Sequence, residues 1–124
     1  MTEKLKIRLR NPESTQFDEQ TREFETASVL GRSRDADLLL MDPGVSRRHA
    51  MLLPGDPGEW FVEDLHSTRG TIVNGRRLEP GEMVSIIPGD LIEINPWSML
   101  VLDDNPDTGG MILDESSVKG RIED

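Results

Sequence analysis

Turn-forming dipeptides recur along the chain at short intervals, and they leave room only for short segments of regular structure between them. Each combines proline, glycine, asparagine or aspartate, the residues that favour tight turns. They stand at Asn11-Pro12, Asp42-Pro43, Pro54-Gly55, Pro57-Gly58, Asn74-Gly75, Pro80-Gly81, Pro88-Gly89 and Asn95-Pro96. No segment of about a dozen residues between them keeps a helical period. Many short strands joined by frequent turns predict an all-β sandwich or barrel.

The segments between the turns have strand character. Leu5, Ile7 and Leu9 alternate with charged residues, as in a half-buried first strand. The segments 71–73 and 76–78 flank Asn74-Gly75, the strongest short signal for a β-hairpin. Further strands are expected at 24–30, 38–40, 49–53, 59–65, 83–87, 91–94 and 99–102.

The length and charge of the chain limit its function. At 124 residues there is room for one domain with a proper core. The protein has 24 acidic and 14 basic residues, a net charge of -10, which argues against binding to nucleic acid or to anionic membranes. Without a membrane-spanning or signal segment, we expect a soluble, intracellular protein, with the cytoplasm favoured over the nucleus. The absence of cysteine removes disulfides, thiolate metal ligands and cysteine nucleophiles.

The acidic residues concentrate at the C-terminal end. Seven acidic and two basic residues lie between Asp103 and Asp124, so this segment carries half of the net charge. Such a polar, acidic stretch is typical of a flexible tail or a linker. We therefore predict one folded domain over residues 1–104 and an acidic flexible tail or linker over 105–124.

Three segments combine arginine, small hydroxyl residues and glycine beside predicted strands, at 31–33, 45–50 and 64–71. They belong to an interval, 32–77, that contains seven arginines and no lysine. Guanidinium groups, hydroxyls and the backbone amides of glycine turns are the groups that hold a phosphate dianion. An ordinary solvated surface rich in arginine explains the arginine bias equally well. In that interpretation Arg32 forms a surface salt bridge with Asp35 or Asp37.

An enzymatic interpretation is less well supported. Ser46, His49 and Asp64 supply the residue types of a hydrolase triad, but no Gly-x-Ser-x-Gly elbow is present. The sequence has two histidines, no cysteine and no His-Glu-x-x-His spacing, which argues against a zinc site. No nucleotide-binding glycine loop is present either. We expect no catalytic residue, no metal and no cofactor.

The ordered motifs Gly31-Arg32, Ser46-x-x-His49, Ser67-Thr68-x-Gly70-Thr71 and Val73-Asn74-Gly75 resemble the forkhead-associated (FHA) domain family over roughly residues 5–103. The resemblance implies an FHA-like β-sandwich of about eleven strands in two twisted sheets, with binding loops at one end. It also implies a phosphothreonine-dependent interaction module for signal transduction. Such a module recruits a protein that a Ser/Thr kinase upstream has phosphorylated.

The resemblance also implies roles for individual residues. Arg32 would pair with the phosphate, and Ser46 would donate its hydroxyl to a phosphate oxygen. Thr68 would add contacts to the phosphate and help frame the pocket for the threonine methyl group. Arg47 would contact the phosphate or the peptide backbone, and we count Arg69, which departs from the family pattern, among the residues that bind the phosphopeptide. A structural set would shape or brace the loops from behind, and it comprises Gly31, His49, Gly70, Thr71 and Asn74.

The sequence departs from the family pattern at two positions. Arg69 stands where many members carry an asparagine that holds the peptide backbone, and arginine can only donate hydrogen bonds. Gly44 stands where some members carry a basic residue two places before the serine. We hypothesise that Arg69 shifts preference toward acidic residues C-terminal to the phosphothreonine.

Two alternatives stay open. One is a phosphate-independent scaffold of the FHA type, although the intact set of Arg32, Ser46 and Thr68 favours phosphopeptide binding. The other is a self-association module. Thr15, in the polar segment Ser14-Thr15-Gln16, would then be phosphorylated and occupy the site of the same or a neighbouring copy.

Overall fold

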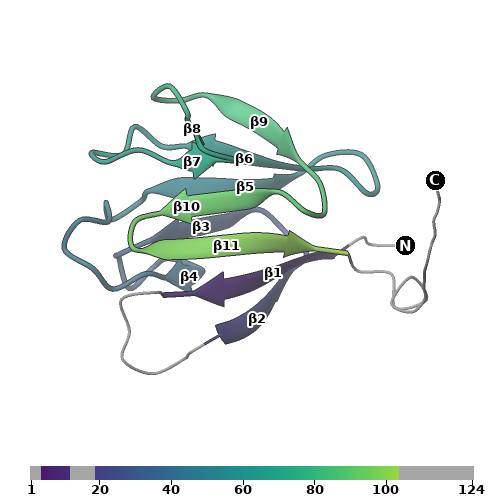
Figure 1. Ribbon diagram of the computed structural model, residues 1–124, viewed down its shortest axis with the longest axis horizontal. Helices are drawn as coiled ribbons and strands as arrows, with labels where there is room; N and C mark the ends of the chain where they lie inside the picture. Colours follow the sequence, from purple (N-terminus) through teal and green to yellow (C-terminus); the bar gives the residue numbers. More distant parts are fainter. Residues whose placement is uncertain (1–3, 12–18, 104–124) are drawn as a thin grey trace.

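The computed structural model describes residues 4–11 and 19–103, and this part of the protein is entirely β-structure and loops (Figure 1). No helix long and apolar enough to cross a membrane occurs within it. The strands are β1 (Leu5–Arg10), β2 (Glu19–Phe24), β3 (Ser28–Gly31), β4 (Leu38–Leu39), β5 (Ala50–Pro54), β6 (Trp60–Asp64), β7 (Ile72–Val73), β8 (Arg76–Arg77), β9 (Met83–Ile86), β10 (Leu91–Ile94) and β11 (Trp97–Leu102).

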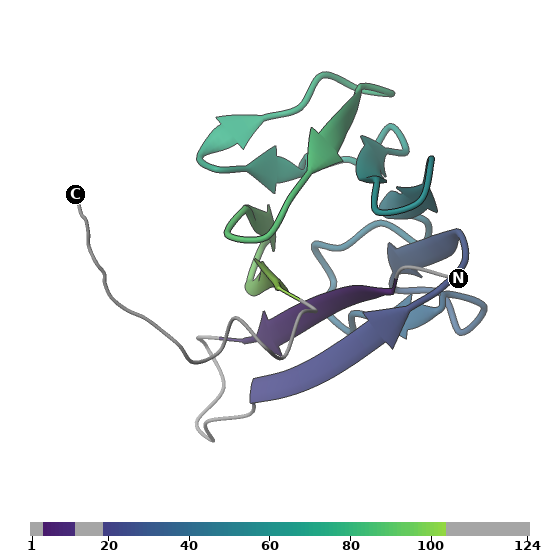
Figure 2. The same ribbon diagram turned by 90° about the vertical axis from the view of Figure 1, so that its right-hand side faces the viewer.

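The strands form two sheets that pack face to face, as Figures 1 and 2 show. One sheet has six strands in the order β2-β1-β11-β10-β7-β8, and the other has five in the order β4-β3-β5-β6-β9. Strands β3 and β4 pair in parallel, whereas the longer pairs of both sheets are antiparallel. The expected two-sheet β-sandwich of eleven strands is confirmed for the described residues.

The core lies between the sheets because successive side chains of a strand point to opposite faces. In β1 the alternating residues Leu5, Ile7 and Leu9 are all buried, as their spacing predicts. The antiparallel register places Ile7 beside Val101 in the six-stranded sheet. Burial of such apolar surface contributes about 25 cal/mol for each Å² removed from water, and it is the main force that holds the two sheets together.

Three loops meet at one end of the sandwich, on the left in Figure 1. They are the β3–β4 loop (32–37), the β4–β5 loop (40–49) and the β6–β7 loop (65–71). The His49 amide donates to the Leu30 carbonyl, and the Leu65 amide donates to the His49 carbonyl, both at 2.9 Å. The ends of β3 and β6 and the start of β5 are thereby fixed side by side, so the three motif segments share one rim.

Strand β2 differs from the sequence-based expectation. We predicted one strand over 24–30, but β2 ends at Phe24 and β3 begins only at Ser28. The five residues of β2 before Phe24 are exposed, because β2 is an edge strand of the six-stranded sheet. Its polar sequence therefore carries no apolar alternation. The predicted tail over 105–124 and the self-association residue Thr15 lie outside the described residues.

Candidate functional site

The β3–β4 and β4–β5 loops are joined along their backbones at the start of the site. The Arg32 amide donates to the Ser46 carbonyl at 3.0 Å, and the Ser33 amide donates to the Arg47 carbonyl at 3.2 Å. Gly31 permits this contact, since a Cβ atom there would lie 2.1 Å from the carbonyl oxygen of Arg47. Glycine is therefore required at position 31 by the close approach of two backbones.

The side chain of Arg32 is fixed by the neighbouring loop. Its Nε atom donates to the Val45 carbonyl at 3.0 Å. Among residues 4–11 and 19–103, the two terminal nitrogens of the guanidinium group have no partner. The salt bridge considered with Asp35 or Asp37 does not occur in the described part of the protein. The Asp37 carboxylate instead accepts from the Val29 amide at 2.8 Å. Arg32 is thus held at the loop rim by a backbone carbonyl and not by an acidic neighbour.

Ser46 connects the β4–β5 loop to the β6–β7 loop. Its Oγ atom accepts a hydrogen bond from the Thr68 amide at 3.0 Å. A hydroxyl can accept and donate at the same time, so the Ser46 O–H group stays available as a donor. The bond also places the backbone of the exposed Thr68 next to the Ser46 hydroxyl.

His49 braces both loops from behind. It is 1% exposed, its Nδ1 atom accepts from the Ser46 amide at 3.0 Å, and its Nε2 atom lies 2.8 Å from the Gly70 carbonyl. This pair of bonds requires neutral imidazole with the proton on Nε2. Burial disfavours the charged form and lowers the pKa of His49 from 6.5, against the opposing effects of the Gly70 carbonyl and Asp64.

Asp64 fixes the β6–β7 loop, a role that the sequence analysis missed. Its buried carboxylate accepts from the Ser67 hydroxyl, from the Ser67 amide at 3.2 Å and from the Thr71 hydroxyl at 2.7 Å. The Ser67 hydroxyl oxygen in turn accepts from the Gly70 amide at 3.0 Å. An aspartate at a strand end with hydroxyl residues three and seven places later is the sequence signal for such a turn.

Gly70 meets two requirements at the end of this loop. Its φ of 92° lies in the left-handed region, which favours glycine. A Cβ atom there would also lie 2.4 Å from the Nε atom of Arg77, so the arginine side chain packs directly over Gly70. The loop is thus held by His49 through the Gly70 carbonyl and covered by Arg77.

Gly44 and Arg69, the two positions that depart from the family pattern, lie against each other in the structure. A Cβ atom on Gly44 would lie 2.6 Å from Nη1, 2.7 Å from Cζ and 2.9 Å from Nε of Arg69. The guanidinium group of Arg69 therefore lies across Gly44, in the space where a side chain at position 44 would begin. Arg69 carries positive charge from the β6–β7 loop to the β4–β5 loop, which the sequence did not reveal.

Three further predicted residues, Arg47, Thr71 and Asn74, lie at different places relative to the rim. Arg47 is exposed beside Ser46, and Thr71 is fully buried as a partner of Asp64. Asn74 lies at the other end of β7, where its side chain donates to Asp90 at 3.0 Å and accepts from the Leu91 amide at 2.9 Å. Asn74 thus braces the β7–β8 hairpin against the β9–β10 loop and does not touch the rim.

The imidazole of His49 is not available as a base at the rim. Both nitrogens of His49 are engaged by backbone groups, so the considered triad of Ser46, His49 and Asp64 is not formed. A shallow hollow of about 450 Å³ beside Arg32 is lined also by Met41, Asp42 and Pro43. Within residues 4–11 and 19–103, no group of histidine and acidic side chains is arranged to hold a metal ion.

Comparisons with known proteins agree with this geometry. The sequence matches the family model of the FHA domain over residues 28–95, more than half of the chain. FhaB, an FHA domain-containing protein of Mycolicibacterium smegmatis, is 38% identical over 73 residues, which cover 55% of this chain and 46% of FhaB. The chain spans less than half the length of the first curated relatives that it matches.

Solved structures show the same fold. One, from a structural and functional analysis of phosphothreonine-dependent FHA domain interactions, has a TM-score of 0.66 and 27% identity, covering 81% of this protein and 98% of that one. The FhaA FHA domain complexed with the intracellular domain of Rv3910 has a TM-score of 0.65 and 28% identity, covering 78% and 98%. The resemblance indicated by the motifs is confirmed.

Replacing Asp64 by asparagine tests the loop network. Ser67 and Thr71 both donate to the Asp64 carboxylate. In Asp64→Asn, one of its oxygens is replaced by an amide group that also donates, so one of these hydrogen bonds is lost. We expect the free energy of unfolding to fall by about 1–3 kcal/mol. Amide hydrogen exchange at Thr68 and Gly70 becomes faster. Urea unfolding and exchange measured by NMR check both. Asp56→Asn, an exposed change at the opposite end, is the control and shifts stability by less than about 0.5 kcal/mol. Equal stability of the two variants would contradict this role.

The pH dependence of stability tests the neutral state of His49. Because its pKa is lowered from 6.5, the folded state binds fewer protons than the unfolded state just below that pH. The stabilisation by His49 is complete above pH 6.5 and is lost as the pH falls through the window down to the lowered pKa. The stability difference between wild type and His49→Gln should therefore stay constant above pH 6.5 and narrow as the pH falls below it. Urea unfolding on both sides of pH 6.5 measures it, and a difference that stays constant or widens below that pH would refute it.

Proposed function

Since this chain belongs to the FHA domain family, we propose that it is a phosphothreonine-dependent interaction module that recruits a partner phosphorylated by a Ser/Thr kinase. FHA domains are interaction modules rather than enzymes. The observation that carries the proposal is the convergence of Arg32, Ser46 and Thr68 on one rim. The three come from different loops, and backbone bonds position Arg32 and link Ser46 to Thr68.

A phosphate group matches the donors at this rim. It carries about −1.5 to −2 charges at neutral pH and three strong acceptor oxygens. The terminal nitrogens of Arg32 supply charge-assisted bonds, and the hydroxyls of Ser46 and Thr68 supply further ones. Unmodified threonine offers no comparable acceptor, so kinase action creates the ligand.

Preorganisation explains how so small a contact binds. The Ser46 oxygen already accepts the Thr68 amide, and Arg32 is already bonded through Nε to Val45. Little conformational entropy is therefore lost in the loops when the phosphate arrives. We expect moderate affinity and fast exchange, as suits a reversible signalling contact.

The proposal includes no chemical step. The Ser46 hydroxyl faces no free base, because His49 uses both of its nitrogens on backbone groups. We propose that the protein works without a cofactor or metal. The net charge of -10 disfavours nucleic acid and anionic membranes as partners, and dependence on a Ser/Thr kinase implies an intracellular setting.

Replacement of Arg32 is the direct test of phosphate recognition. Arg32→Ala should weaken binding of a phosphothreonine peptide library by about thirty-fold or more, because a charge-assisted contact worth about 2–4 kcal/mol is lost. Fluorescence anisotropy measures the affinity. Arg34→Ala, an exposed arginine of the same loop, is the matched control and should bind like wild type.

Matched threonine and phosphoserine libraries complete this experiment, and both should bind much more weakly than the phosphothreonine library. Equal binding of the unphosphorylated library, or equal losses in Arg32→Ala and Arg34→Ala, would contradict the proposal. Folded protein that binds no library at all would favour the phosphate-independent scaffold.

Arg69 is proposed to set sequence preference. Its guanidinium group lies across Gly44 and is exposed, so it can pair with an acidic residue C-terminal to the phosphothreonine. An exposed pair contributes about 0.5–1 kcal/mol, so acidic residues should improve binding by about two- to five-fold. A peptide array should show this preference for wild type and for Arg48→Ala, but not for Arg69→Asn. The same preference in Arg69→Asn would rule out this role.

A further inference from the structure

The outer face of the five-stranded sheet is unusual for its composition. The register aligns Met51 with Glu63 and Glu63 with Met83 across β5, β6 and β9. The next row on the same face aligns Leu53 with Phe61 and Phe61 with the exposed Ser85. These side chains point away from the core, because their neighbours along each strand are the buried core residues.

Apolar residues dominate this surface. Met83 is 53% exposed on β9, and Leu39, on β4 at the other edge of the sheet, is 43% exposed. Met51, Leu53 and Phe61 between them are partly exposed. We call this set of Leu39, Met51, Leu53, Phe61 and Met83 the apolar face.

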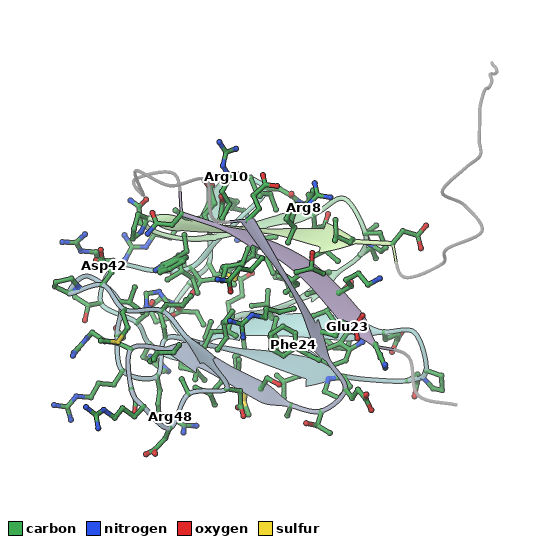
Figure 3. The ribbon with its side chains drawn as sticks, turned by 90° about the horizontal axis from the view of Figure 1, so that it is seen from below. Arg8, Arg10, Glu23, Phe24, Asp42 and Arg48 are labelled. Atoms are coloured by element: carbon green, nitrogen blue, oxygen red, sulfur yellow. The ribbon has the colours of Figure 1, made fainter. Side chains whose placement is uncertain are left out.

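The opposite side of the sandwich shows what an ordinary outer face looks like in this protein. On the six-stranded sheet, Arg8 and Arg10 lie across from Thr21 and Glu19 in the register. Figure 3 shows Arg8 and Arg10 pointing away from the sandwich there. Charged residues of β1 thus lie beside the partly exposed Leu100 and Leu91 of β11 and β10 on that sheet, whereas Glu63 is the charged residue in the central rows of the other.

The apolar face is separate from the phosphate rim. Its residues lie along strand bodies, while Arg32, Ser46 and Thr68 lie in loops at the end of the sandwich. Within the apolar face, Met51, Leu53, Phe61 and Met83 lie on neighbouring strands, and the buried Val29 of β3 separates them from Leu39. The largest exposed apolar patch of a typical monomer measures roughly 300–600 Å² and is often functional. Methionine suits such a surface because its flexible, polarizable side chain adapts to a partner.

We propose that the apolar face binds one amphipathic helix of a partner protein, with a lysine or arginine of that helix opposite Glu63. The size of the face favours this occupant. With strands about 4.8 Å apart and about 3.3 Å per residue, it measures about 20 by 15 Å. That is about 300 Å², well below the roughly 800 Å² per partner of a standard interface between two proteins.

A single helix fits these dimensions. It is about 10 Å wide, and about three turns of it span 15 Å. Apolar residues at positions i, i+3, i+4 and i+7 form a stripe that can cover the face. The Glu63 carboxylate lies between Met51 and Met83 and has no hydrogen-bond or ion-pair partner among the described residues. A lysine or arginine on the helix supplies an ion-pair partner for this carboxylate.

A displayed library of fifteen-residue amphipathic helical peptides tests the proposal. Binders selected on the folded domain should lose affinity at least about ten-fold against the double variant Met51→Ser, Met83→Ser, because the buried apolar contact is removed. The matched control is Leu100→Ser, a partly exposed leucine on the outer face of the six-stranded sheet, and it should retain binding. Unchanged thermal unfolding and unchanged phosphopeptide binding show that each variant is folded.

The charge of Glu63 makes the prediction more specific. Selected helices should carry lysine or arginine within the apolar stripe, and selection on Glu63→Lys should enrich aspartate or glutamate at that position instead. Arg32→Ala should leave helix binding unchanged, which separates this surface from the phosphate rim.

Three results would overturn the proposal. The first is the absence of any binder sensitive to Met51→Ser, Met83→Ser. The second is a selected stripe without charge preference in wild type and Glu63→Lys. The third, from analytical ultracentrifugation, is a dimer of the wild type that the double variant dissociates, because the face would then be covered by a second copy.

Discussion

The site depends on one buried imidazole. His49 accepts from the Ser46 amide and donates to the Gly70 carbonyl, and so it links the β4–β5 loop to the β6–β7 loop beneath the rim. Both bonds need the neutral ring, and burial favours that form. With the loop held in this way, the Ser46 Oγ atom accepts a hydrogen bond from the Thr68 amide. Without this bridge, the donors on the two loops would have no fixed relation to one another.

The residues that stabilise the sandwich and those proposed to bind the ligand lie in different parts of the molecule. Apolar residues between the sheets hold the sandwich together, and four of the five buried polar residues of the described part, His49, Asp64, Ser67 and Thr71, lie at one end of it. Asp64 and His49 are costly to bury unless they are hydrogen-bonded, and each of them has two partner residues there. This satisfied polar network fixes loops that would otherwise be mobile, so the rim is rigid without a regular strand or helix.

The sequence predicted the sandwich and most residues of the rim, because turns, alternation and motifs are local signals. It failed where the determining fact is a contact between distant segments. Strand β2 is polar and pairs only at an edge, so no periodicity marks it. The placement of Arg69 over Gly44 joins residues 25 positions apart. Asp64 was considered only as a catalytic type, since its role depends on the folded turn that includes Ser67.

An NMR titration with a phosphothreonine peptide tests the central claim most directly, that a preformed rim of Arg32, Ser46 and Thr68 receives the phosphate. The account predicts large amide shifts confined to residues 31–34, 44–48 and 67–70, with small shifts on the strands and none with the unphosphorylated peptide. It also predicts a changed Arg32 Nε signal. Shifts spread over the whole sandwich, or centred away from the rim, would contradict it.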